Sequence, residues 1–282
     1  MAKKIHEKDC HLLVFTDLDG TLLDHKTYSF KGALPAIKFL KEKNIPLIFC
    51  SSKTRAELEL IKLQLDNAHP FIPENGGAIF VPKAYFSEKF NFTKEDSSYL
   101  IIELGIPYAK LREAFKHIGT IIPGIHKGFG DFSLEEVADL CGFSSDQAEL
   151  AKMREYDEPF ILKDEASETD VQEIAGRLNL RITRGGRFYH LTGQNDKGKA
   201  VSILKKIYED MSRNKSESLK TIALGDSFND KSMLEVVDYP ILIQKPDRSY
   251  DPSVRLDNLI LASGNGPSGW CAALIKLLNI LL

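Results

Sequence analysis

Two carboxylates stand one residue apart at the end of a predicted buried strand. The apolar run 12–16 is rich in branched and aromatic side chains, and Asp17, Asp19 and the flexible Gly20 follow it. Ligands of open parallel sheets bind beyond the carboxyl ends of the strands. Asp17 is therefore a candidate nucleophile toward phosphorus, and Asp19 a candidate general acid and base. The alternative is an Asp-rich turn that only closes the strand.

Ser51 and Lys197 are two further candidates at predicted helix starts. Ser51 follows the predicted strand 46–50 and precedes a helix that opens with a capping box at Thr54. A hydroxyl and backbone N–H groups at such an entrance can hold a phosphate, although simple helix capping explains the same residues. Lys197 at a helix start opposes the helix dipole, so it needs an anionic partner there, or it is a surface lysine.

Two more carboxylates follow the predicted strand 221–224. Asp226 and Asp230 are four residues apart, which places them on one side if a helical turn forms. Together with Asp17 and Asp19 they would form an oxygen-rich site for a hard cation, Mg²⁺. A helix cap would account for one of the two acids but not for both. The sequence therefore predicts a magnesium site with these four residues as ligands.

The elements that must position these residues alternate between strand and helix. Strands at 12–16, 46–50, 70–72 and 221–224 and amphipathic helices between them predict an α/β fold with a doubly wound parallel sheet, at 1–84 and 190–282. Residues 85–189 lose this pattern and mix capped helices with short strand-like pieces. They predict a separate α+β domain inserted into the first one.

Composition limits the partners of the chain. A net charge of −3 over 282 residues gives no electrostatic footprint for nucleic acid, and no stretch approaches the ~20 apolar residues of a membrane span. The four cysteines are far apart with no CxxC pair, which argues against a zinc site. We expect a reducing, cytoplasmic setting. We expect a small-molecule partner; the sequence does not indicate an oligomeric state.

As a set, these segments resemble the four motifs of the haloacid dehalogenase-like (HAD) phosphatases, in the same order. The insert between the second and third motifs resembles the large cap of their type IIB subclass. The resemblance implies that Asp17 is the nucleophile and that Asp19 is the general acid and base and also offers a backbone carbonyl to Mg²⁺. It further implies that Ser51 and Lys197 hold phosphoryl oxygens, that Asp226 binds the metal, and that Asp230 supports it.

A closer resemblance is to the mannosyl-3-phosphoglycerate phosphatases. It rests on six segments, several of them in the insert: 51–55 (SSKTR), 73–77 (PENGG), 127–131 (KGFGD), 154–160 (REYDEPF), 184–188 (RGGRF) and 266–270 (GPSGW). It implies Mg²⁺-dependent hydrolysis of mannosyl-3-phosphoglycerate to mannosylglycerate and phosphate through an aspartyl-phosphate. Another sugar phosphate, such as glucosyl-3-phosphoglycerate, is an alternative substrate. A phosphomutase is another reading, and a non-enzymatic regulatory module is disfavoured because the acids and Lys197 are all present.

Substrate contacts are expected from both parts of the chain. The basic groups Lys127, Arg184 and Arg187 could meet the substrate carboxylate, since an Arg fork pairs well with it. The flexible glycines beside them, Gly128, Gly185 and Gly186, are further expected contacts. Glu74 and Asn75 could bind sugar hydroxyls, and Asn229 is a further substrate contact in the fourth motif. For each residue alone, an exposed charge or a turn is the alternative.

Overall fold

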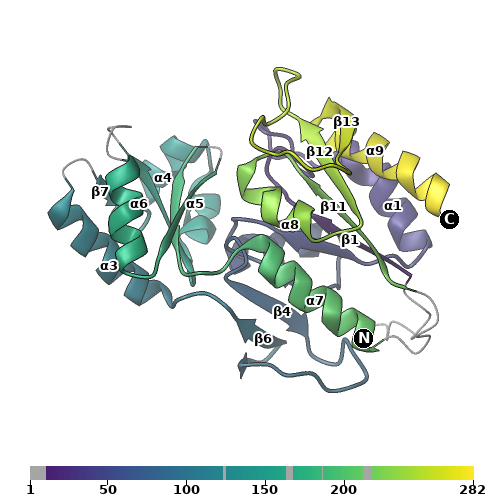
Figure 1. Ribbon diagram of the computed structural model, residues 1–282, viewed down its shortest axis with the longest axis horizontal. Helices are drawn as coiled ribbons and strands as arrows, with labels where there is room; N and C mark the ends of the chain where they lie inside the picture. Colours follow the sequence, from purple (N-terminus) through teal and green to yellow (C-terminus); the bar gives the residue numbers. More distant parts are fainter. Residues whose placement is uncertain (1–10, 123–124, 163–167, 186, 212–217) are drawn as a thin grey trace.

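The computed structural model describes residues 11–122, 125–162, 168–185, 187–211 and 218–282 (Figure 1). Its strands form a nine-stranded sheet in the order β13-β12-β11-β1-β2-β3-β4-β6-β5 and a four-stranded sheet in the order β7-β8-β10-β9. The predicted Gly186 contact, the start of the chain with Cys10, and the loop 212–217 lie outside the described residues.

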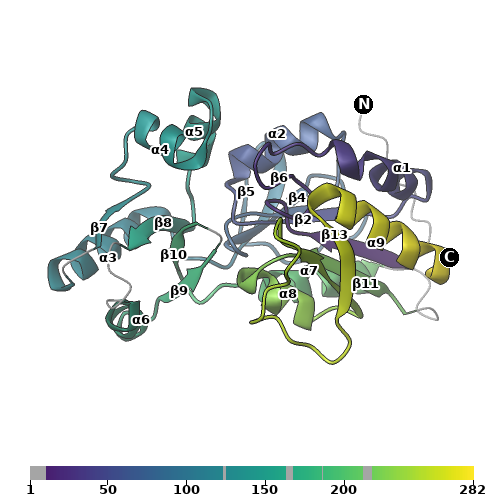
Figure 2. The ribbon, with the colours of Figure 1, turned by 90° about the horizontal axis from the view of Figure 1, so that it is seen from above.

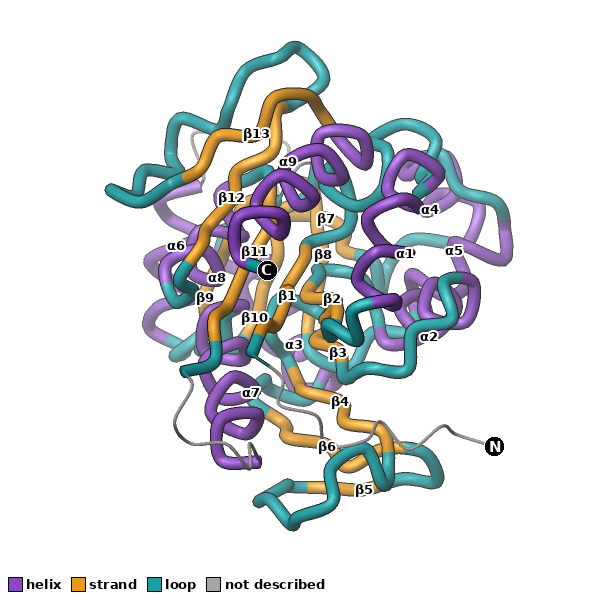
Figure 3. Tube along the Cα trace, turned by 90° about the vertical axis from the view of Figure 1, so that its right-hand side faces the viewer, coloured by secondary structure: helices purple, strands orange, loops and turns teal. Residues whose placement is uncertain are grey.

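The large sheet combines a parallel part with an antiparallel edge (Figure 3). Its parallel strands are β1 (Leu12–Thr16), β2 (Leu47–Cys50), β3 (Phe71–Ile72), β11 (Lys220–Gly225), β12 (Tyr239–Gln244) and β13 (Ile260–Asn265). The antiparallel strands at the other edge are β4 (Ala78–Pro82), β6 (Tyr99–Glu103) and β5 (Lys94–Glu95). The parallel strands all end at one edge, which is where the candidate residues were predicted to meet.

Helices cover both faces of this sheet (Figure 2). One face carries α1 (Leu34–Glu42), α2 (Arg55–Gln64) and α9 (Gly266–Leu281), and the other carries α7 (Lys197–Met211) and α8 (Lys231–Glu235). Alternate residues of β1 serve the two faces, because Leu12 and Val14 pack in the first core and Leu13 and Phe15 in the second. The predicted doubly wound α/β fold is thus confirmed.

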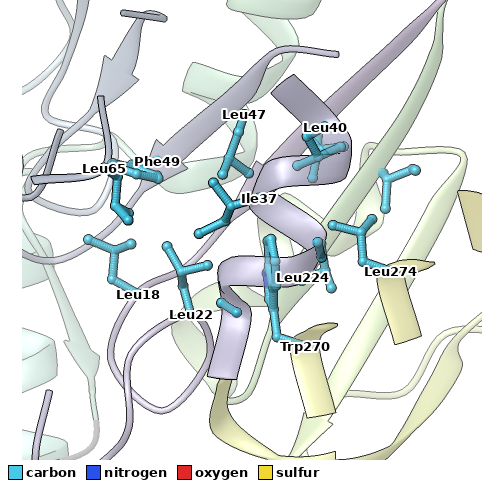
Figure 4. Close-up of a cluster of buried hydrophobic side chains, with 14 of the residues drawn as sticks. Leu18, Leu22, Ile37, Leu40, Leu47, Phe49, Leu65, Leu224, Trp270 and Leu274 are labelled. Carbon is cyan, nitrogen blue, oxygen red and sulfur yellow. The ribbon is translucent and has the colours of Figure 1, made fainter. Parts of the chain in front are cut away.

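The first core is centred on Trp270, whose side chain is completely buried (Figure 4). It packs among leucines and isoleucines of α1 and of the central strands, such as Ile37 and Leu224. Its indole N–H donates to Thr16 Oγ1 at 2.9 Å, and the Thr16 hydroxyl donates to the Asp17 carbonyl at 2.6 Å. Core packing therefore fixes the backbone at the end of β1.

The small sheet is antiparallel and forms the centre of the predicted insert. It contains β7 (Ile125–Gly128), β8 (Asp157–Leu162), β9 (Arg181–Arg184) and β10 (Tyr189–Thr192). Helices α3 (Tyr108–Ile121) and α6 (Glu168–Arg177) pack on it around Phe115 and Phe160. Helices α4 (Leu134–Cys141) and α5 (Ser145–Lys152) form a separate cluster around Val137 and Phe129, and α5 contacts α2 of the large unit.

Strand pairing bears on the predicted domain boundaries. β5 and β6, which a boundary after residue 84 assigns to the insert, pair in the large sheet, and β10, which a boundary at residue 190 divides, pairs in the small one. The polar residues around 86–96 gave no strand period, and β5 within them forms at the sheet edge by pairing with β6, whose other neighbour is β4. We propose that the insert begins after β6 and ends after β10. Among the described residues, no helix has the length and apolarity that a membrane crossing requires.

Candidate active site

The candidate residues of the large unit meet at the carboxyl edge of its parallel strands. Asp17 follows β1 directly, and its backbone N–H donates to the Leu224 carbonyl of β11 at 2.9 Å. Ser51 follows the neighbouring strand β2, and Asp226 follows β11. The predicted convergence of these residues therefore holds in space, for the reason that parallel strands end at a common edge.

Lys197, the first residue of α7, joins two of the carboxylates. Its Nζ lies 2.7 Å from Asp17 Oδ1 and 2.6 Å from Asp230 Oδ1, and its side chain is fully buried. Burial by itself would lower the pKa of Lys197, but the charges of Asp17 and Asp230 raise it above its ordinary value. The ammonium group is thus held charged beside the candidate nucleophile, at the helix start where the dipole alone disfavours it.

The carboxylates are crowded beyond what one lysine offsets. Asp17, Asp226 and Asp230 each place an oxygen within 4.8 Å of the others' oxygens. Burial, and after it the charge of Asp230, raises the pKa of Asp17 to about 7. Burial and the charges of Asp230 and Asp17 also raise the pKa of Asp226. A divalent cation among these oxygens would relieve the repulsion, and an all-carboxylate donor set suits Mg²⁺. The cluster therefore fits the predicted metal.

Backbone geometry holds the two acids of the fourth motif. Asp230 ends the short helical turn Phe228–Asp230, and its Oδ2 accepts from the N–H groups of Asp226 at 3.0 Å and Ser227 at 3.1 Å. Its other oxygen is left for Lys197. Gly20, with φ of +79°, packs against Asp226, because a Cβ there would stand 2.8 Å from Asp226 Oδ2. A side chain at position 20 would therefore collide with Asp226, so the turn after β1 requires glycine there.

The Asp19 carboxylate lies outside this three-carboxylate cluster. Its Oδ2 pairs with Lys53 Nζ at 3.1 Å, and its Oδ1 is buried without a hydrogen-bond partner among the described residues. The predicted metal contact of Asp19 is through its backbone carbonyl. Its side chain would therefore not be occupied by the metal and would be available for proton transfer. Ser51 is completely buried, and its Oγ accepts from the Lys53 N–H at 3.3 Å.

Glu74 and Asn75 lie where the two units join. Both Glu74 carboxylate oxygens accept from the backbone N–H of Glu155, at 3.0 and 3.1 Å, and one also accepts from Tyr156 at 2.8 Å. Glu74 thus binds the segment that enters β8, and burial raises its pKa to about 8. Asn75 bridges the units, since its amide donates to Asp157 Oδ2 at 3.1 Å and its Oδ1 accepts from Asn229 Nδ2 at 3.3 Å.

The predicted substrate contacts in the insert are spread over three places. Lys127 is exposed and pairs with Glu136 at 2.7 Å, and the Gly128 N–H donates to Asp131 at 3.0 Å. The Arg184 guanidinium lies over the Tyr189 ring, 5.4 Å from its centroid. The Gly185 N–H donates to the Phe188 carbonyl at 2.9 Å.

Arg187 is the predicted insert residue that reaches the large unit. Its guanidinium donates to the Tyr28 hydroxyl and, at 3.2 Å each, to the carbonyls of Leu140 and Cys141. Lys127 pairs within the insert, with Glu136, whereas β9, of which Arg184 is the last residue, contacts the turn Phe228–Asp230 of the large unit.

Two residues near the site were missed in the sequence. Lys53 stands just before the N-cap of α2, so the argument that singled out Lys197, a cation at a helix start, applies equally to it. Arg154 is buried and donates to the Ser52 carbonyl at 2.7 Å, joining the insert to the loop after β2. No spacing in the sequence indicates this second contact, because it joins segments about a hundred residues apart.

Comparisons with known proteins agree with this geometry. A family model described as haloacid dehalogenase-like hydrolase matches residues 14–108. The chain is 49% identical over 268 residues to a glucosyl-3-phosphoglycerate/mannosyl-3-phosphoglycerate phosphatase of Methanococcoides burtonii, covering 95% of this chain and 97% of the relative. A relative of the same name from Persephonella marina is 45% identical over 270 residues, with the same coverage of both chains. This chain belongs to the haloacid dehalogenase-like phosphatases.

A solved structure supports the fold of this phosphatase. A HAD subclass IIB sugar phosphatase superposes with a TM-score of 0.63 at 17% identity, over 95% of this chain and 99% of the other. At that identity the likeness concerns the fold, and it includes the cap domain that the insert resembles. The family model and the two relatives confirm the predicted family and the phosphoric monoester hydrolase class.

Proposed function

We propose that this phosphatase hydrolyses mannosyl-3-phosphoglycerate and glucosyl-3-phosphoglycerate to the glycosylglycerate and phosphate, with Mg²⁺. The observation that carries the proposal is the buried Asp17–Lys197–Asp230 arrangement beside Asp226 at the carboxyl edge of the sheet. The named activity of the Methanococcoides and Persephonella relatives supports the substrate class and favours the glucosyl ester as a second substrate.

The proposed reaction has two displacements at phosphorus. In the first, an Asp17 oxygen forms a bond to phosphorus while the bond to the glycerate oxygen breaks, and the carboxyl proton of Asp19 passes to the departing oxygen. In the second, Asp19 takes a proton from water as the water oxygen attacks the aspartyl-phosphate and the Asp17–phosphorus bond breaks. Inorganic phosphate leaves and both aspartates return to their starting forms.

The residues around Asp17 align and neutralise charge. Lys197, 2.7 Å from Asp17, and the Ser51 hydroxyl would bind the phosphoryl oxygens. Asp17, Asp226 and Asp230 would hold Mg²⁺, with the Asp19 backbone carbonyl. The ion, when bound, supplies positive charge that offsets the negative charge of the phosphoryl group and of the carboxylates.

The proposed substrate contacts come from the large unit and from the insert. Asn229 directly precedes Asp230 in the chain and its amide donates to Asn75 Oδ1, so the two asparagines are placed to meet a group attached to the phosphate. Arg187 and Arg184 remain candidates for the substrate carboxylate, with Lys127, Gly128 and Gly185 as weaker ones. Glu74 already accepts three backbone N–H bonds, which leaves it less free for a sugar hydroxyl.

A panel of phosphate esters tests the proposal. We expect kcat/KM for mannosyl- and glucosyl-3-phosphoglycerate to exceed that for 3-phosphoglycerate, mannose 6-phosphate and glucose 6-phosphate by at least about 10²-fold, because the cap must recognise both the sugar and the carboxylate. Equal rates across the panel would remove the substrate assignment. Transfer of phosphate to a sugar, with no free phosphate released, would favour a phosphomutase.

We further propose a reducing, cytoplasmic setting. The described cysteines Cys50, Cys141 and Cys271 are free and buried, which supports it. Burial raises the pKa of the Cys141 thiol to about 11, so this thiol is poorly reactive. The substrate class, a small phosphorylated metabolite, agrees with the same setting.

A further inference from the structure

Lys53 is a buried cation that the mechanism above does not use. It lies in the loop between β2 and α2, and its side chain is 7% exposed. Its Nζ pairs with Asp19 Oδ2 at 3.1 Å and with Glu57 Oε1 at 3.2 Å. Glu57 is itself held by the capping box of α2 with Thr54. The lysine therefore connects a fixed carboxylate in a helix to the carboxylate that we propose transfers protons.

Two aromatic rings cover the same ammonium group. The Lys53 Nζ is 5.1 Å from the centroid of the Tyr28 ring and 5.4 Å from that of the Phe143 ring, and the two rings lie 5.2 Å apart. A cation over an aromatic face is attracted by the ring quadrupole, more strongly when it is desolvated. Tyr28 belongs to the large unit, whereas Phe143 lies between α4 and α5 of the insert. One wall of the Lys53 site thus comes from the insert.

Other contacts between the units surround this site. The Tyr28 hydroxyl donates to the Cys141 carbonyl at 3.3 Å and accepts from Arg187, and the Thr54 hydroxyl donates to the Leu150 carbonyl at 2.8 Å. Tyr28, Lys53 and Thr54 therefore form a continuous contact with the α4–α5 part of the insert. If the insert moved away, Lys53 would lose the Phe143 ring while keeping both carboxylates.

We propose that Lys53 is a positioning residue for Asp19, and that Phe143 of the insert completes its site only when the insert covers the core. This inference rests on the proposed function, in which Asp19 delivers the proton to the leaving oxygen. The Asp19 side chain is 38% exposed and, apart from Lys53, no described ion pair holds it. Lys53 fixes its orientation, so proton delivery to a bound ester is fastest with the insert in place.

The test separates proton delivery from general damage by the choice of leaving group. Lys53→Met keeps the length of the side chain but removes its charge. We expect single-turnover release of the glycosylglycerate from glucosyl-3-phosphoglycerate to fall about 10–100-fold, whereas release of p-nitrophenolate from p-nitrophenyl phosphate, which needs no proton, changes less than about threefold. KM for the glucosyl ester is expected to stay within about threefold of wild type.

Second variants keep the test decisive if Lys53→Met folds poorly. Phe143→Leu retains apolar volume without a π face and should lower the glucosyl-ester rate about fivefold, in the same leaving-group-dependent way. Phe143→Tyr keeps the ring and should match wild type, and Lys53→Arg should restore part of the lost rate. Lys41→Met, which removes an exposed lysine paired with Asp66 at 3.1 Å, is the control for loss of one charge.

Three outcomes would overturn the inference without touching the proposed function. They are equal losses with both esters, a rise in KM with unchanged kcat, which would make Lys53 a substrate ligand, and a Phe143→Leu variant identical to wild type. A wild-type enzyme that releases no phosphate from either glycosyl-3-phosphoglycerate would instead refute the proposed function itself.

Discussion

Buried lysines at the two ends of the large sheet have pKa values shifted in opposite directions. At the carboxyl edge, Lys197 and Lys53 each face two carboxylates, whose charges raise their pKa values above the ordinary one despite burial. At the amino edge, Lys62 of α2 donates to the His69 carbonyl, lies 3.4 Å from Asn67 Oδ1, and lies 5.1 Å from the centre of the Phe71 ring. Burial lowers the pKa of Lys62 to about 7.

The contrast shows what burial alone does to a cation and what a built site adds. Nearby His69 follows the same rule as Lys62, since burial lowers its pKa to about 3. Among the residues that the structure describes, the acids that cluster closely enough to hold a metal ion lie at the carboxyl edge and come from separate segments of the chain. A buried ammonium group paired with two acids therefore distinguishes the carboxyl edge from the surroundings of Lys62.

The largest effect is expected at the nucleophile. Asp17→Asn preserves the shape of the side chain but removes the attacking oxygen's charge, so turnover should fall by about 10⁴-fold or more. Phosphate release from glucosyl-3-phosphoglycerate measures it, with far-ultraviolet circular dichroism as the check on folding. Turnover close to that of wild type would show that the carboxyl edge does not act through Asp17.

The next effect tests the two edges directly. Lys197→Met should lower kcat by about 10²–10³-fold, because it removes the charge 2.7 Å from Asp17 and leaves the carboxylates unopposed. Lys62→Met is the matched variant at the amino edge, where the same substitution should leave kcat unchanged. If both variants lost activity to the same degree, the distinction between the edges would be wrong.

A smaller effect is expected from the glycine beside the metal site. Gly20→Ala places a Cβ 2.8 Å from Asp226 Oδ2, so it should displace that carboxylate and raise the Mg²⁺ concentration for half-maximal activity about 10–100-fold. Gly142→Ala is the control, since Gly142 also has a positive φ, +69°, but no atom lies within 4 Å of the added Cβ. Magnesium titrations of both variants, at saturating substrate, compare strain alone with strain plus displacement. Equal shifts in both would assign the effect to backbone strain.

The smallest effect concerns stability at the amino edge. Below about pH 7, Lys62 holds its proton in both states; above it, the folded protein releases the proton while the unfolded chain keeps it to about pH 10. The unfolded state then binds more protons, so the stabilisation of the wild type relative to Lys62→Met should rise with pH, by at most about 1.4 kcal/mol per unit. Urea unfolding at pH 6.5, 8 and 9.5 measures the difference. A flat or falling difference would mean that Lys62 stays charged when buried.

Much of the core site was predictable because its residues follow apolar strands. Asp17, Ser51 and Asp226 each stand directly after one, and parallel strands bring their carboxyl ends to a common edge. Lys197 was predictable from its unfavourable place at a helix start. The edge strand β5 was not predictable, since its residues Lys94 and Glu95 are polar and it is formed by pairing with β6. The apolar strand β6 was missed in the sequence.

Glu74 shows why the contacts of the insert were harder to predict. Its type suggests a ligand for sugar hydroxyls, yet both oxygens accept N–H groups of Glu155 and Tyr156, some eighty residues away. Side-chain type gives the chemistry that a residue can do. It does not determine which groups of the folded protein the residue contacts.

The sequence by itself determined the family, the α/β fold and the residues that converge around Asp17, because those follow from local periodicity and from the geometry of parallel strands. Only the tertiary structure decided that Asp19 pairs with Lys53 and that Phe143 of the insert covers this lysine. Such contacts depend on how two separately formed units meet, and no spacing along the chain encodes that distance.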